Sequence, residues 1–213
     1  AELDVIAWTT LIGAHAQCGK NDEASQLFFK MQHQGTNPNK VTFVSLFDIY
    51  EGEAVIESVK RMHSYVIECG LASDVTVSNA VIKMYGKCHN VEKAQEIFNA
   101  MDDRDVIAWN AMMACYVHCE DFPKACSLFK RMMNDKSGVK PNNITFANVL
   151  VATAEQLAFD EGQMIHAHII RDGIEQDLLV SNSLINMYSK CGNVGIAQIV
   201  FNKLSKRDVV SWN

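Results

Sequence analysis

The sequence has 213 residues, of which 48% are hydrophobic, 21% are charged and only 3 are proline. This composition is typical of a folded globular protein and excludes disordered and collagen-like chains. With 19 Lys and Arg against 25 Asp and Glu, the net charge of −6 has the wrong sign for a protein that holds nucleic acid by bulk charge.

No apolar run approaches the roughly 18 residues that a membrane span needs, and residues 1–4 lack the pattern of a signal peptide. The chain has 7 cysteines, and no two of them have the Cys-x-x-Cys spacing. We therefore expect reduced thiols, with neither a disulfide framework nor a zinc site. We expect no membrane partner, no metal and no cofactor.

The chain repeats itself at an offset of about 100 residues. Asp-Val-Ile-Ala-Trp at 4–8 returns at 105–109 and, as Asp-Val-Val-Ser-Trp, at 208–212, so that all 3 tryptophans share one register. Between these markers, segments 77–88 and 180–191 share the pattern Val-Ser-Asn, Met-Tyr and Lys-Cys. An internal repeat of this kind is typical of an array of stacked units.

A finer period of about 35 residues lies within each long copy, and each piece contains two helical patterns. Over 75–105, apolar residues recur at the spacing of one helix face in two runs: Val77, Val81, Met84, Tyr85 and Cys88, then Val91, Ala94, Ile97, Phe98 and Met101. Asn90, between the runs, is suited to cap the second helix. A hairpin of about 30 residues is too small to hold a core alone, so neighbouring hairpins must stack.

Cutting the chain at the repeated acidic or Asn residue gives hairpins of 35, 35, 31, 37, 35 and 31 residues. The six segments are 5–39, 40–74, 75–105, 106–142, 143–177 and 178–208. Residues 1–4 would end a preceding repeat, and residues 209–213 would begin a further one. We therefore predict a piece of a longer array, whose uncapped ends allow end-to-end self-association.

Three motifs resemble those of plant pentatricopeptide-repeat proteins: Val-Ile-Ala-Trp-Asn at 106–110, Gly-Val-Lys-Pro-Asn at 138–142 and Asn-Ser-Leu-Ile-Asn-Met-Tyr-Ser-Lys-Cys-Gly at 182–192. The resemblance covers essentially the whole chain. It implies an all-α fold, a right-handed α-solenoid of helix-turn-helix repeats with about 12 helices.

The rhythm of repeat lengths resembles the PLS subclass of this family, in which standard, long and short variants alternate. The resemblance makes 5–39 and 106–142 standard, 40–74 and 143–177 long, and 75–105 and 178–208 short. Segment 106–142 departs from the standard form because residues 133–137 make it two residues longer.

The resemblance implies a single-stranded RNA ligand that is read at one base per repeat. The family's readers are the fifth and the last residue of each repeat, here Thr9 with Asn39, Val44 with Asp74, Asn79 with Asp105, Asn110 with Asn142, Ala147 with Asp177, and Asn182 with Asp208. By the family's code these pairs imply the base that each of the six repeats binds, which we call the register. From 5′ to 3′ it is A, any base, U, C or U, any base, and U. Two registers read nothing because Val and Ala side chains form no hydrogen bond.

Two further sets of residues are expected to contact the RNA, and the first of them follows from the resemblance. The second residue of each repeat is expected to pack against base faces: Ile6, Val41, Thr76, Ile107, Ile144 and Leu179. Lys87, Lys190 and His118, near the ends of first helices, are expected to contact phosphates. An apolar second residue fits a simple contact at the helix start equally well.

Structural roles compete with these assignments. An Asp at a repeat end is also a good turn former and suits the start of a helix, so Asp74 alone says little. Asn is a mediocre helix former, and its recurrence at 79, 110 and 182 in one register needs another reason. His63 and His166 lie among apolar neighbours and are interpreted as packing residues.

The leading hypothesis is the RNA-binding part of a plant organellar RNA-processing factor, in the mitochondrion or chloroplast, that serves cytidine-to-uridine editing. Editing cofactors or a deaminase domain would lie outside this chain. We expect no catalysis here, because no His-x-Glu is followed by the Pro-Cys-x-x-Cys of zinc deaminases. The alternative is a protein-interaction scaffold that binds a peptide as tetratricopeptide repeats do.

Overall fold

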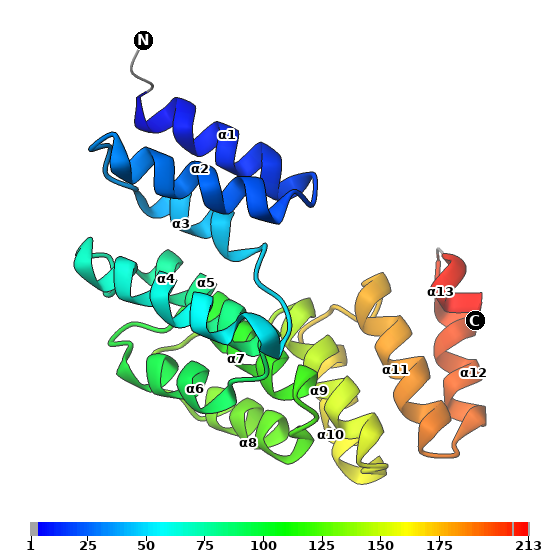
Figure 1. Ribbon diagram of the computed structural model, residues 1–213. Coiled ribbons are helices and arrows are strands. Elements are labelled where there is room, and N and C mark those ends of the chain that lie inside the picture. The colour runs from blue at the N-terminus through cyan, green and yellow to red at the C-terminus, as the bar shows by residue number, and fades with distance from the viewer. Residues whose placement is uncertain (1–3, 206, 213) are drawn as a thin grey trace. The chain divides into compact units, whose positions relative to one another are not determined.

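The computed structural model describes residues 4–205 and 207–212, and that part consists of thirteen α-helices and one 3-10 helix, without strands (Figure 1). The elements are α1 (Val5–Gln17), α2 (Asn21–His33), α3 (Lys40–Phe47), η1 (Glu53–Val55), α4 (Ile56–Glu68), α5 (Val75–Lys87), α6 (Val91–Ala100), α7 (Val106–His118), α8 (Phe122–Met133), α9 (Asn143–Glu155), α10 (Phe159–Arg171), α11 (Leu178–Lys190), α12 (Val194–Lys203) and α13 (Val209–Trp212). The predicted all-α repeat fold is confirmed, with α13 added to the twelve expected helices. Residues 1–3 and 213, which belong to the predicted end segments, lie outside the described residues.

The chain divides into two compact units, residues 1–104 and 105–213. In the first unit α3 packs between α1 and α5, while α2 packs on α1, and α4 and α6 pack on α5. In the second unit α7, α9, α11 and α13 follow one another, with α8, α10 and α12 packed beside them. Each unit thus has one layer of first helices and one of second helices, the arrangement of stacked helical hairpins (Figure 1).

Every first helix follows an Asp or Asn whose side chain accepts a backbone N–H from the first turn. The distance from the side-chain oxygen to the nitrogen three residues further on is 2.8 to 3.2 Å for Asp4, Asn39, Asp74, Asp105, Asn142, Asp177 and Asp208. Each such cap contributes about 1 kcal/mol. The cap predicted at Asn90 is also confirmed, because its side chain accepts from the Lys93 N–H at 3.1 Å.

Equivalent large side chains form the cores of the two units. Trp8 and Trp109 are buried near the starts of α1 and α7, and Tyr85 and Tyr188 are buried in α5 and α11. The apolar face predicted for α5 is confirmed, since its five residues are all buried. Trp212 shares the register of the other tryptophans but is 69% exposed.

The second helices of the predicted short repeats, α6 and α12, end after 10 residues, and an arginine folds back on the end of each. Arg104 Nε donates to the Phe98 carbonyl at 2.9 Å and its Nη2 to the Asn99 carbonyl at 2.8 Å, while the guanidinium lies 5.2 Å from the Phe98 ring centroid. Arg207 repeats this arrangement at the end of α12. The carbonyls at a helix end lack partners and favour a cation, so the arginine closes the helix after 10 residues.

In the predicted long repeat of the first unit, α3 stops at Phe47 after 8 residues, whereas the equivalent α9 in the second unit has 13. The chain then passes Gly52, whose φ of 86° lies in the left-handed region. The Gly52 N–H donates to the Lys87 carbonyl at 3.1 Å, which ties this segment to the end of α5.

His63 and His166 occupy equivalent places, and their interpretation as packing residues is confirmed. His63 Nδ1 lies 3.1 Å from Tyr85 Oη, and His166 Nδ1 lies 2.8 Å from Tyr188 Oη, with 5.6 Å between ring centroids in both pairs. Burial lowers the pKa of both histidines, and the charges of Lys93 and Lys203 lower them further. The folded protein therefore resists protonation of these rings.

We expect the free energy of unfolding to fall as the pH drops below about 6.5, the pKa of an unfolded histidine. Below that pH the unfolded chain binds protons that the folded chain does not, so acid shifts the equilibrium toward unfolding. Urea unfolding at pH 7.5 and 5.5 measures the difference. The double variant His63→Gln, His166→Gln should have a shallower pH dependence, and an unchanged slope would contradict this account.

Candidate nucleic-acid interface

The fifth residue of each predicted repeat lies on a first helix, and the last residue is the cap of the next first helix. We call these two side chains the reading pair of a repeat. Thr9, Asn79, Asn110 and Ala147 are buried, and Val44 and Asn182 are half-buried. Because each cap lies at the start of the helix beside the fifth residue, the fold brings the two positions together wherever one unit contains both.

The reading pair Asn110 and Asn142 is held by direct hydrogen bonds. Asn110 Nδ2 donates to Asn142 Oδ1 at 3.0 Å, and Asn142 Oδ1 also accepts the backbone N–H of Thr145 at 3.0 Å. The hydroxyl of Thr145 lies 2.7 Å from Asn110 Oδ1 and 3.0 Å from Asn142 Oδ1. Thr145 itself is fully buried.

The same arrangement recurs in the last repeat. Asn182 Nδ2 donates to Asp208 Oδ1 at 3.2 Å, and the Ser211 hydroxyl lies 2.8 Å from both Asn182 Oδ1 and Asp208 Oδ1. The pKa of Asp208 lies below its ordinary value, because the backbone N–H and then the hydroxyl of Ser211 donate to the carboxylate.

The first repeat has a hydroxyl in the same place. Thr9 Oγ1 lies 2.7 Å from Thr42 Oγ1, and Thr42 Oγ1 lies 3.2 Å from Asn39 Oδ1. The sequence analysis missed Thr42, Thr145 and Ser211, which we call the bridging hydroxyls. Their signal in the sequence is a Thr or Ser three residues after the last residue of a repeat whose fifth residue is polar.

The two predicted long repeats have a different contact at this position. Val44 and Ala147 offer no hydrogen-bonding group, and Val77 and Val180 stand where the first, fourth and sixth repeats have a bridging hydroxyl. The carboxylates instead meet the first residue of their own repeat. Asp74 Oδ2 lies 3.5 Å from Lys40 Nζ, and Asp177 Oδ2 accepts from Asn143 Nδ2 at 3.0 Å.

Burial alone would raise the pKa of Asp74, but the pKa lies below its ordinary value. Hydrogen bonds from the Val77 and Thr76 N–H groups and the charge of Lys40 favour the carboxylate. The carboxylate at this cap is therefore held in its charged form.

The reading pair predicted for the third repeat is divided between the units. Asn79 is buried on α5 in the first unit, where only 6% of its surface is exposed. Asp105 caps α7 in the second unit through the Ala108 N–H at 2.8 Å. Ala108 stands in the position of the bridging hydroxyls.

The predicted base-packing residues are exposed without exception. The exposed fraction is 47% to 70% for Ile6, Val41, Ile107, Ile144 and Leu179, and Thr76 is exposed as well. Each lies in the first turn of a first helix, two residues after the cap. Five of the six are aliphatic side chains that project into solvent beside a cap.

Both lysines that are predicted to contact phosphates form ion pairs with carboxylates of the protein. Lys87 Nζ is 3.2 Å from the Asp48 carbonyl and 3.9 Å from the Asp48 carboxylate, which also pairs with Lys83 at 2.7 Å. Lys190 Nζ lies 2.5 Å from Glu155 Oε1. His118 is the last residue of α7. A phosphate would have to compete with these carboxylates, although exposed pairs contribute only about 0 to 1 kcal/mol.

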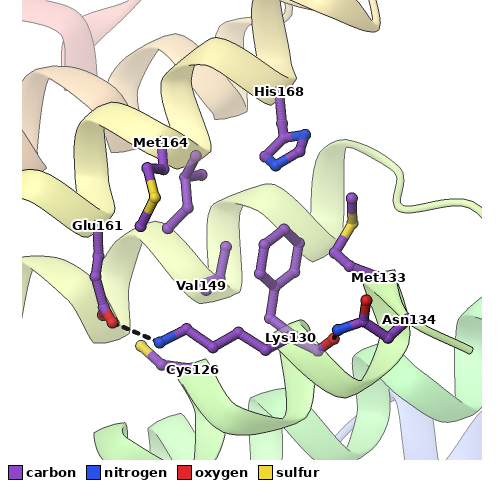
Figure 2. A pocket seen from close by; sticks show the side chains of 10 residues that line it. Cys126, Lys130, Met133, Asn134, Val149, Glu161, Met164 and His168 are labelled. Carbon is purple, nitrogen blue, oxygen red and sulfur yellow. Dashed lines mark hydrogen bonds and ion pairs between the residues drawn. The ribbon is translucent and has the colours of Figure 1, made fainter.

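A separate cavity of about 260 Å³ lies between α8, α9 and α10 in the second unit. Apolar side chains such as Phe129, Val149 and Met164 line it, and Lys130 Nζ pairs with Glu161 Oε1 at 2.6 Å beside it (Figure 2). It contains none of the reading pairs. Among the described residues no group of His, Cys, Asp and Glu could hold a metal ion, and no described helix is long and apolar enough to cross a membrane.

Relatives of this chain are found in plants. In Arabidopsis thaliana, a chloroplastic pentatricopeptide repeat-containing protein is 33% identical over 207 residues, which cover 97% of this chain and 38% of the relative. A mitochondrial one is 31% identical over 210 residues, which cover 99% of this chain and 33% of the relative. The chain therefore spans about a third of the length of these relatives.

Two crystal structures have a similar fold. The pentatricopeptide repeat protein PPR10 from maize is 18% identical, with a TM-score of 0.64 over 99% of this chain and 35% of PPR10. PPR10 in complex with an 18-nt psaJ RNA element is 21% identical, with a TM-score of 0.69 over 95% of this chain and 28% of PPR10.

Sequence models of the repeats account for most of the chain. The model of the PPR repeat family matches residues 3–50 and 104–153, and the PPR repeat model matches residues 76–106 and 180–209. Together they cover more than half of the sequence, and the chain belongs to the pentatricopeptide repeat (PPR) family.

Proposed function

We propose that the chain binds single-stranded RNA sequence-specifically, with one base for each repeat. The observation that carries the proposal is the recurrence of a polar fifth residue hydrogen-bonded, directly or through a hydroxyl, to the cap of the next first helix. PPR10, whose fold is similar, has been crystallised in complex with RNA. The repeats are binding modules, so the chain itself is not an enzyme.

Helix capping alone accounts for the last residue of each repeat, because all seven caps accept an N–H from the next helix. Capping does not account for the fifth residue. An Asn inside a helix costs stability relative to Ala or Leu, yet Asn79, Asn110 and Asn182 all lie inside one. An amide that offers a donor and an acceptor suits the edge of a base, and this favours base reading.

The second residues support a stacking role. Five exposed aliphatic side chains lie one turn or less from the caps. Packing such a side chain against the flat face of a base removes apolar surface from water, which is favourable in free energy. With the family's code, the reading pairs give the register A, any, U, C or U, any, U from 5′ to 3′. Val44 and Ala147 leave the second and fifth bases unselected.

The net charge of −6 is compatible with this ligand if the cations gather where the phosphates pass. We assign this role to Lys87, Lys190 and His118. The carboxylates of Asp48 and Glu155 hold the two lysines in place in the free protein, and a phosphate can replace them as partner because exposed ion pairs are weak.

For the whole protein, we propose a plant organellar RNA-processing factor of the PLS subclass that serves cytidine-to-uridine editing. Its relatives are named chloroplastic or mitochondrial, which supports an organellar location. Editing cofactors or a deaminase domain would lie outside the residues of this chain.

Binding selection from a randomised RNA pool tests the proposed function. We expect the enriched RNAs to share a uracil at the third and at the sixth position of the register. Their bases at the second and fifth positions should vary. Equal binding of unrelated RNAs would instead favour a peptide-binding scaffold like the tetratricopeptide repeats.

The clearest substitution is Asn79→Thr, because a small hydroxyl paired with Asp corresponds to guanine in the family's code. We expect preference at the third base to move from uracil to guanine while the other registers stay unchanged. A mismatched base edge costs about 1 to 3 kcal/mol, so relative affinity should change about tenfold or more in competition binding.

Asn182→Thr is the matched control, since the same change should act on the sixth base and leave the third unaltered. If Asn79→Thr weakens binding of all four RNAs equally, Asn79 is a structural residue and the assigned register is wrong.

Lys87→Ala should reduce the slope of log affinity against log salt by about 0.7, the value for one phosphate contact on a single strand, without changing base preference. Lys83→Ala is the control, because Lys83 pairs with the same Asp48 carboxylate but is not assigned to a phosphate. If the slope for Lys87→Ala equals that of the unaltered protein, Lys87 does not contact a phosphate of the bound RNA.

A further inference from the structure

The bridging hydroxyls make a contact that helix capping does not require. In a capping box the third residue of the helix bonds only to the cap, as Thr145 Oγ1 does by accepting the Asn142 N–H at 3.0 Å. Thr145 also reaches back 35 residues to the side chain of Asn110. Thr42 and Ser211 reach Thr9 and Asn182 in the same way, at 2.7 and 2.8 Å.

Hydrogen-bond counting shows that Thr145 fixes the orientation of the Asn110 amide. Asn142 Oδ1 accepts from the Thr145 N–H and from Asn110 Nδ2, which uses both of its lone pairs. The single hydroxyl hydrogen of Thr145 is therefore directed to Asn110 Oδ1, the nearer acceptor at 2.7 Å. A flipped Asn110 amide would place its Oδ1 against Asn142 Oδ1, which is also an acceptor, and would turn its NH2 group toward the Thr145 hydroxyl, so both bonds would be lost.

The fixed amide has a defined set of groups left for a ligand. Among the described residues, Asn110 retains one N–H and one lone pair, in an order that Asn142 and Thr145 together determine. Cytosine presents a donor beside an acceptor on its edge, and uracil presents an acceptor beside a donor. A side-chain amide that can flip fits either order, whereas a fixed amide fits one order better.

Where both residues of a reading pair lie in one unit, the occurrence of the bridging hydroxyl follows the polarity of the fifth residue; the third repeat, whose pair is divided between the units, has the polar Asn79 but Ala108 in place of the hydroxyl. Within the two units it is present after Asn39, Asn142 and Asp208, where the fifth residue is Thr or Asn. Valine replaces it after Asp74 and Asp177, where the fifth residue is Val44 or Ala147. A residue needed only for capping would have no reason to follow the fifth residue in this way.

We infer that Thr42, Thr145 and Ser211 are positioning residues, which set the orientation of the base-reading side chain in the preceding repeat and thereby its choice of base. This inference rests on the proposed RNA-binding function. Base choice in a repeat then depends on three side chains, of which the third belongs to the next repeat along the chain.

The test is the base preference of Thr145→Val, which keeps the shape of the side chain and removes the hydroxyl. The ratio between the best-bound and worst-bound base at the fourth position, about tenfold or more for a base edge that is read, should fall at least about threefold. Preferences at the first and sixth positions should stay unchanged. Thr145→Ser retains the hydroxyl and should retain the preference.

Thr153→Val is the matched control. Thr153 is also fully buried in α9, and its hydroxyl bonds to the Val149 carbonyl at 2.7 Å, away from the reading pair. Its loss should lower stability while base preference at the fourth position persists. If Thr145→Val does not fold, Ser211→Ala makes the same test at the sixth base.

A second readout needs no RNA. Ser211→Ala should raise the pKa of Asp208 toward its ordinary value in a carbon-13 NMR titration, because one of its hydrogen-bond donors is lost.

The outcomes separate the two proposals. If the unaltered protein selects bases and Thr145→Val selects them equally well, the positioning role is wrong and RNA reading stands. If the unaltered protein selects no base at any position, the proposed function fails, and the inference fails with it.

Discussion

The structure depends on one repeated interaction, the hydrogen bond from the first turn of each first helix to the Asp or Asn that precedes it. This cap determines where each hairpin begins, and it recurs seven times at 2.8 to 3.2 Å. Within a unit, the oxygen that caps one helix also bonds to the fifth residue of the preceding first helix where that residue is Asn, as Asn142 does to Asn110 and Asp208 to Asn182. The residue that caps each of the next first helices is therefore also one of the two residues in a proposed reading pair.

The cap also explains why the proposed reading groups are ordered before a ligand binds. Asn142 and Asp208 are held by backbone N–H groups, and their partners Asn110 and Asn182 are held in turn by the caps and the bridging hydroxyls. Such preorganisation lowers the conformational entropy that binding must overcome. The exposed aliphatic residues beside the caps have no comparable restraint from hydrogen bonds and contribute through apolar contact.

Much of the fold could be predicted from the sequence because its signals are local. The spacing of apolar residues predicts the buried face of α5, and Asn90 predicts the start of α6, since both depend on residues within a few turns. The early end of α6 could not be predicted, because it depends on the folding back of Arg104 onto Phe98 and Asn99. The short α3 likewise depends on contacts of residues 48–52 with the end of α5.

The candidate site was predictable only in part, because several of its contacts join residues that are far apart in the sequence. The reading pairs follow from the family resemblance, but the bridging hydroxyls belong to the next repeat and are about 30 residues away from the side chains they contact. The carboxylate partners of Lys87 and Lys190 come from a preceding repeat as well. Contacts between repeats are tertiary, so a pattern within one repeat does not reveal them.

The most direct test of the account is NMR observation of the side-chain amides during titration with an RNA of the predicted register. We expect the amide signals of Asn79, Asn110 and Asn182 to shift on binding, each in response to its own base. The amide of Asn202, near the end of second helix α12, should not move. Shifts confined to Asn202 and the other second-helix amides, with the three fifth-position amides unchanged, would contradict the account.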